Sequence, residues 1–183
     1  MLHKILTVAA VLFAAGSLYA QKPVAAAVTD IEDNPSNGLE MCRSLFNEYY
    51  LSELTTHSKV NMLDTASTQN QINKLELSRG QDLSADQIKK LCSALKTDAL
   101  CLLKMTRGEK NTIVATVKIV DKEGKTAGSV KASMKGIGDT DAVSRTLATD
   151  SARILRKIRG IEEKENRKSE EKTPSLPSTV TQI

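Results

Sequence analysis

The sequence holds few of the side chains that nucleic-acid binders need. It has no tryptophan, its aromatic content is 3%, and beyond residue 20 the only rings are Phe46, Tyr49 and Tyr50. Single-stranded nucleic acid is bound by stacking bases on exposed rings, and three rings within one helical segment are a poor supply. The formal net charge of +4 is also too small to point to a phosphate backbone. We therefore predict no nucleic-acid partner.

Histidine and recognisable catalytic motifs are also scarce. The chain has two histidines, and only His57, in a polar segment, lies beyond the amino-terminal region. Catalytic triads and most catalytic zinc sites use histidine, and the sequence contains no Cys-x-x-Cys pair, phosphate-binding loop or nucleophile elbow. We predict a non-enzymatic protein with no cofactor and no metal site. The alternative is a hydrolase whose carboxylates come together only in the fold.

No apolar run is long enough to span a membrane. The run at residues 5–15 is shorter than the roughly 20 residues that a membrane-crossing helix requires, and it follows the basic Lys4, as in a secretory signal peptide. Small residues place cleavage after Ala20, with Ser17 as the other cut, and an uncleaved anchor as the alternative. We predict a signal peptide at 1–20 and a periplasmic location. No cysteine stands directly after the cut, so we expect no lipid anchor there.

The remainder divides into one folded domain and a tail. Residues 162–172 are almost wholly charged, and residues 173–179 are rich in proline and serine. Such a composition buries too little apolar surface to offset the entropy of ordering the chain. We predict a single α/β domain at 21–160, of ordinary domain size, and a disordered tail at 161–183.

Hydrophobic periodicity predicts the elements of this domain. The expected order is strand, helix, strand, helix, helix, three strands and a last helix, which is an α/β (α+β) fold with a mixed sheet of about five strands and helices packed on it. The predicted strands are residues 24–31, 60–64, 99–106, 112–121 and 127–135, and the predicted helices are residues 39–54, residues 67–79, one that begins at Ser84 and one that begins at Asp139.

Local signals mark several helix ends. Ser84 and Gln87 have the spacing of a capping box, in which each side chain bonds the other residue's backbone amide. Gly80 is expected to end the second helix in the left-handed conformation, and Gly160 the last one. Basic residues crowd the end of that last helix, where the helix dipole favours cations; binding to anionic lipid or polymer is the alternative explanation.

Three cysteines, Cys42, Cys92 and Cys101, follow the predicted signal peptide. In an oxidising compartment an odd number leaves at least one thiol unpaired or pairs it between chains. Cys42 and Cys92 fall within the apolar stripes of two predicted helices, so we interpret the cysteines as small buried hydrophobic residues. Whether any of them pair is left open.

The middle of the chain resembles the bacterial envelope superfamily that contains the amino-terminal domain of TolB, the curli secretion protein CsgG and the penicillin-binding-protein activator LpoB. The resemblance is carried by residues 60–64, 73–80, 88–100 and 113–120, and Asp98 with Ala99 stands near the family's Ala-Asp pair. A family glycine is replaced around residues 93–94, and the lipid-anchor cysteine of many relatives is missing, which puts tethering to the outer membrane in doubt.

The resemblance implies a partner-binding module with no catalytic residues to carry over. We therefore expect an accessory protein that engages a protein partner in cell-wall synthesis or envelope assembly, with a penicillin-binding protein among the candidates. An oligomeric secretion or appendage component like CsgG is the alternative, although the loops at 107–110 and 122–125 are too short for membrane-inserting hairpins. Homo-oligomer formation and peripheral membrane contact are left open.

The sequence also suggests where a partner binds. Residues 127–135 form the most polar of the predicted strands, which is typical of a sheet edge. A partner could add a strand to that edge. We therefore predict a partner-binding edge at Ser129, Lys131 and Ser133.

Overall fold

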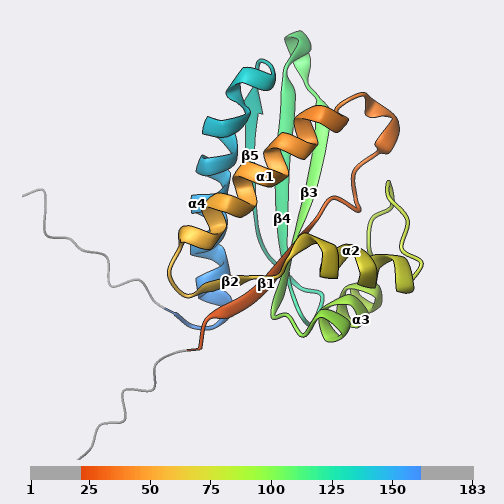
Figure 1. Ribbon diagram of the computed structural model, residues 1–183, viewed down its shortest axis with the longest axis vertical. Helices are drawn as coiled ribbons and strands as arrows, with labels where there is room; N and C mark the ends of the chain where they lie inside the picture. Colours follow the sequence, from red (N-terminus) through yellow and green to blue (C-terminus); the bar gives the residue numbers. More distant parts are fainter. Residues whose placement is uncertain (1–21, 162–183) are drawn as a thin grey trace, which may run out of the picture.

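The computed structural model describes residues 22–161, which form one five-stranded sheet with helices packed on it (Figure 1). The predicted signal peptide at 1–20 and all but Ile161 of the predicted tail lie outside the described residues. The strands are β1 (Val24–Thr29), β2 (Val60–Met62), β3 (Ala99–Arg107), β4 (Ile113–Asp121) and β5 (Thr126–Met134), and the α-helices are α1 (Glu40–Thr56), α2 (Thr65–Lys74), α3 (Ala85–Leu95) and α4 (Thr140–Ile158).

The sheet is mixed, as the sequence predicted. Its strand order is β2-β1-β3-β4-β5; β1 runs parallel to β2 and β3, and β3, β4 and β5 form an antiparallel meander. Parallel strands need long crossovers. Helix α1 connects β1 to β2, and α2 with α3 connects β2 to β3, which lies on the other side of β1. The α+β prediction is confirmed, and β5 is an edge strand.

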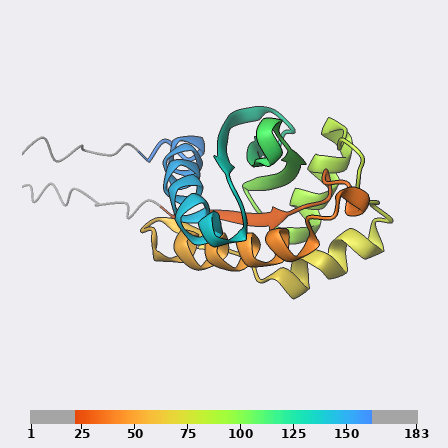
Figure 2. The same cartoon turned by 90° about the horizontal axis from the view of Figure 1, so that it is seen from above.

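Alternating side chains of the central strands feed two hydrophobic clusters. On β3, Cys101 and Leu103 belong to a cluster with α1 and α4, whereas Leu100 and Leu102 belong to a second cluster with α3. Strand side chains point alternately to the two faces of a sheet, so each cluster lies on its own face. Figure 2 shows α4 and α3 on opposite sides of the strands.

The end of α2 differs from the prediction. The helix stops at Lys74 rather than near residue 79, and Gly80, although it has φ +83°, lies too far along to cap it. Glu76 takes the left-handed conformation instead, and the Leu77 amide bonds the carbonyl of Ile72. The reason is burial: the turn folds Leu77 against the second cluster, which outweighs the helical preference of the sequence.

The start of α3 is held both locally and by a distant turn. The predicted capping box is present: the Gln87 amide donates to the Ser84 hydroxyl at 3.3 Å, and the Ser84 amide donates to Gln87 Oε1 at 2.9 Å. The β4–β5 turn packs against the same helix end through Gly124. This residue has φ +80°, and a Cβ here would lie 2.9 Å from the Cα of Ala85, so only glycine fits.

The last described residues close α4 as expected. Gly160 has φ +64° and follows the cap residue Arg159, and Ile161 after it is buried. Among residues 22–161, no helix is both long and apolar enough to cross a membrane.

Candidate interaction surface

The predicted partner edge lies on the outer strand of the sheet. Ser129, Lys131 and Ser133 are exposed and point to the same face of β5, and within the described residues β4 is the only strand that pairs with β5. The structure thus confirms the edge position. Partner binding at these residues stays a prediction.

The main chain of the same three residues faces outward. The Gly108 amide bonds the Thr112 carbonyl across the β3–β4 turn. Along a strand of an antiparallel sheet, successive residues turn their amide and carbonyl groups to opposite neighbours. Val114, Thr116 and Lys118 of β4 therefore bond to β3, and the residues between them bond to β5. The partners of those intervening residues on β5 have even numbers, among them Val130 and Ala132. Ser129, Lys131 and Ser133 therefore turn their amides and carbonyls away from β4.

Helix α4 occupies the other face of β5. Val130 and Ala132 pack against the first cluster, and the backbone at Gly128 approaches α4 so closely that a Cβ would lie 2.9 Å from Cδ1 of Ile154. Figure 1 shows α4 running beside β5. A partner can therefore reach only the outer edge of β5 and the face of β5 that α4 does not cover.

That opposite face is largely uncovered over the meander. Helix α3 covers only the end of the sheet that holds Leu102 and Val120. Beyond it, the side chains are exposed or half-buried, and we name them the open face: Lys104, Thr106, Val114, Thr116, Lys118, Ser129, Lys131 and Ser133. These residues include three lysines and no acid, so the open face is polar and cationic.

The three lysines differ in how far they are neutralised. Lys118 Nζ lies 2.8 Å from Oε1 of Glu32, whose side chain is 4% exposed. Lys104 Nζ lies 3.9 Å from Asp82, and both of these side chains are solvent-exposed, so that pair is weak. Lys131 has no ion pair within residues 22–161. Lys104 and Lys131 therefore carry most of the positive charge on the open face that no acid neutralises.

A buried ion cluster fixes the loop between β1 and α1. Arg43 on α1 is 3% exposed and pairs through Nε with Asp33, which is 1% exposed, and with Asp30 at 3.7 Å. Arg79 reaches Asp30 from the segment after α2 at 3.2 Å. Asn37 closes the cluster, since its Oδ1 accepts from Arg43 Nη2 at 3.2 Å. The loop is thus held by partners on α1 and after α2.

A cavity of about 390 Å³ lies between this loop and the outer half of β3. Asn34 and Asn37 line it from the loop, and Lys104, Thr106 and Arg107 line it from the strand. Its volume is within the usual range of ligand pockets, about 300–1,000 Å³. We name this cavity the notch.

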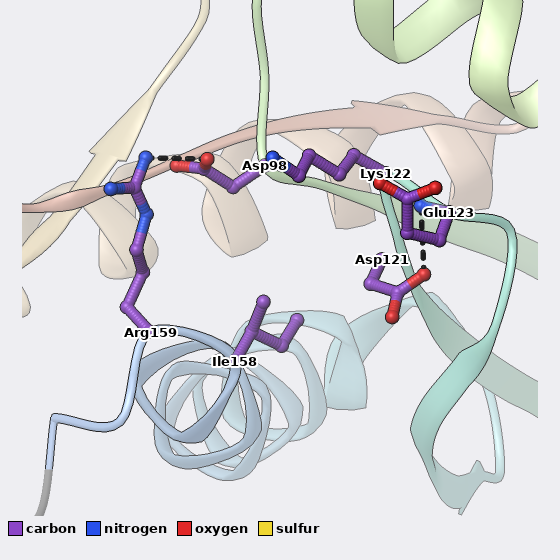
Figure 3. Close-up of a pocket in the computed structure, with 6 residues that line it drawn as sticks. All are labelled: Asp98, Asp121, Lys122, Glu123, Ile158 and Arg159. Atoms are coloured by element: carbon purple, nitrogen blue, oxygen red, sulfur yellow. Dashed lines mark hydrogen bonds and ion pairs between the residues drawn. The ribbon is translucent and has the colours of Figure 1, made fainter.

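A second cavity, of about 290 Å³, lies where β3 begins and α4 ends (Figure 3). Asp98 and Asp121, two of the three acids that line it, are already bonded: Asp98 accepts from the Ala25 amide at 2.9 Å and pairs with Arg159 at 2.5 Å. Asp121 accepts from the amides of Glu123 and Lys125 at 2.9 and 2.8 Å. These carboxylates hold the β4–β5 turn and the end of α4 in place. Asp98, which the resemblance singled out, thus has a structural role.

The cysteines are buried, as the packing interpretation predicted. The question of pairing, which the sequence left open, is answered by the structure. Cys42, Cys92 and Cys101 are all free thiols. Burial raises the pKa of the Cys101 thiol to about 12 and also raises the pKa of Cys92, so neither is an activated nucleophile. Within residues 22–161 no group of three or more His, Cys, Asp or Glu side chains could hold a metal ion. His57 lies 3.7 Å from Glu53 on the preceding helical turn.

The fold and its open face define a class: a small α+β domain that presents a partly uncovered sheet. No family model and no curated protein matches the chain. Similar solved structures include the LpoB carboxy-terminal domains from Salmonella enterica (13% identity, TM-score 0.45, covering 63% of this chain and 85% of that one) and Escherichia coli (12%, 0.48, 67% and 90%). Lipoprotein GNA1162 from Neisseria meningitidis is another (18%, 0.48, 71% and 99%).

At these identities and TM-scores the likeness concerns the fold alone. The sequence did not reveal the buried ion cluster or the notch. The local trace of the cluster in the sequence is three acids, Asp30 at the end of the predicted strand 24–31 and Glu32 and Asp33 just after it.

Proposed function

We propose that this protein is an exported, non-enzymatic accessory protein of the cell envelope that works by binding a protein partner. The observation that carries the proposal is the half-covered sheet: α4 seals one face of β5, while its other face and its outward-turned main chain stay accessible. The apolar run after Lys4 and the resemblance to the TolB, CsgG and LpoB superfamily support export and an envelope role.

Binding fits the described residues better than catalysis. The most buried acids, Asp33 and Glu32, are paired with Arg43 and Lys118. In the second cavity, Asp98 and Asp121 bond main-chain amides. The resemblance suggests a partner in cell-wall synthesis, with a penicillin-binding protein as the first candidate. The partner adds a strand along Ser129, Lys131 and Ser133.

Proline substitution at the edge tests this proposal. Because the amide of Lys131 faces outward, Lys131→Pro removes a donor that the partner would use while keeping the ladder to β4, and edge strands tolerate proline. We expect Lys131→Pro to abolish partner capture from crosslinked membranes while circular dichroism remains unchanged. Lys131→Gln, which keeps the amide, should retain capture. Val130→Pro, which removes a bond to β4, should instead unfold the strand.

Capture that survives both Ser129→Pro and Lys131→Pro would rule out strand addition at β5. Failure of the wild-type protein to crosslink any envelope protein would overturn the binding function itself. Size-exclusion chromatography with light scattering checks the secretion alternative, since a ring subunit runs as a large symmetric particle.

A further inference from the structure

We propose that the notch binds an acidic, extended segment of the protein partner, with carboxylates held by Lys104 and Arg107 and the segment's main chain running along β3. This inference deepens the proposed function and rests on it. It assigns a second contact site, on the side of the meander away from β5.

The first support is an unpaired strand edge. Strand β1 ends at Thr29, opposite Leu102, whereas β3 continues to Arg107. Within residues 22–161, β4 is the only strand paired with that last part of β3. The Met105 carbonyl accepts a bond from Asn37 Nδ2 at 2.9 Å on the side where β1 would continue. Main-chain groups alternate along a strand, so those of Arg107 turn to the same side. Met105 is buried and its carbonyl is bonded to Asn37, so the notch exposes the sheet edge at Arg107.

The second support is the charge of the notch. Its lining acids are neutralised by neighbours, Glu32 by Lys118 and Asp33 by Arg43. Its lining cations are not: Lys104 has only the weak contact with Asp82, and Arg107 has no ion pair within the described residues. The notch therefore carries net positive charge and favours carboxylates.

The third support is the rigidity of the walls. The loop wall is held by the buried ion cluster, and Asn37 ties it directly to Met105 on β3. A preformed site loses less binding free energy because its residues are already ordered before the ligand binds. The unpaired strand edge favours a peptide over a phosphate polymer, because a polymer would use the two cations and leave the main-chain groups unmatched.

The test is an NMR titration of the full chain with a peptide probe. The probe is a blocked hexapeptide that contains three consecutive glutamates, and its twin has glutamines instead. We expect the acidic peptide to shift the amide signals of Met105 and Arg107, and the twin to bind about tenfold more weakly. Lys104→Gln and Arg107→Gln should each weaken binding about threefold, as expected for exposed ion pairs.

Lys89→Gln is the matched control, since it removes an exposed lysine from α3, outside the lining of the notch. It should leave peptide affinity unchanged. The proposal is overturned if amide shifts are absent at millimolar peptide, if they gather at residues 129–133, or if Lys89→Gln weakens binding as much as Lys104→Gln. Equal binding of inorganic phosphate, with the same shifts, would also overturn it in favour of a simple anion site.

The outcome separates this inference from the proposed function. If Lys104→Gln with Arg107→Gln leaves both peptide binding and membrane crosslinking intact, the notch is not a binding site, while the accessory function stands. If the wild-type protein binds the acidic peptide but crosslinks no envelope protein, the proposed function fails although the notch recognises carboxylates.

Discussion

Among single residues, Arg43 is the least expected. It lies on α1 within the face that packs on the sheet, between Cys42 and Phe46, and is 3% exposed. A buried charge is tolerated only when it is paired and hydrogen-bonded. Asp33 and Asp30 meet that requirement from the β1–α1 loop. The loop is acidic because α1 buries a cation beneath it.

Replacing Arg43 therefore destabilises the protein strongly. Arg43→Met leaves Asp33, which is 1% exposed, without its cation, and breaking such a buried pair costs about 3–5 kcal/mol. We expect that decrease in the free energy of unfolding in urea, followed by circular dichroism. Arg153→Met is the control: its pair with Asp150 is exposed, and its loss should cost less than about 0.5 kcal/mol. Equal effects would contradict the burial argument.

Among the elements, α3 and α2 show when a local sequence signal is sufficient to predict where a helix begins or ends. The capping box of α3 joins residues three positions apart and forms as predicted. The end of α2 depends instead on where Leu77 packs in the second cluster. A local bond forms wherever the spacing is right, whereas a packing contact depends on the rest of the chain.

Loss of the cap should weaken α3 by a predictable amount. In Ser84→Ala the Gln87 amide loses its acceptor, which costs about 1 kcal/mol. The measurement is the urea midpoint at constant m-value. Ser93→Ala, at an exposed position in the last turn of the same helix, should cause no loss, because alanine has the higher helix propensity. A comparable loss at both positions would show that the cap contributes nothing specific.

At the scale of the whole molecule, two cores share one sheet. Strands β1 and β3 contribute alternate residues to both clusters: Ala26 and Cys101 to the first, Ala27 and Leu100 to the second. Neither cluster can lose its strands without exposing the other. The described domain should therefore unfold as one cooperative unit.

The cysteines report on this coupling. Cys42 and Cys101 lie in the first cluster and Cys92 in the second, and alkylation requires an exposed thiolate. In a urea series at pH 8, followed by mass spectrometry, we expect all three to become labelled at one midpoint. Labelling of Cys92 at clearly lower urea would show that the α3 side opens by itself.

The same thiols give a pH dependence. The folded pKa of Cys101 is raised by burial to about 12 from a reference value of 9.0. Because the folded state holds the Cys101 proton more tightly than the unfolded state, the thiol contributes to the free energy of unfolding. That contribution is complete below about pH 9 and is lost as the pH rises toward 12. The cysteine-labelling experiment is therefore run at pH 8, where this contribution is still complete.

Much of the fold was determined by the sequence alone. The order of strands and helices, the edge position of β5, the cap of α3 and the burial of Cys42, Cys92 and Cys101 all follow from hydrophobic periodicity and from residues a few positions apart. These patterns depend on the chain's own helical and strand repeats, and no distant contact alters them.

The tertiary structure alone decided the end of α2, the buried ion cluster, the open face and the notch. Each depends on pairs that no local pattern encodes: Glu32 with Lys118 lie 86 positions apart, and Asn37 with Met105 lie 68 apart. A side chain's charge appears in the sequence, but whether that charge is neutralised depends on which neighbour the fold brings to it.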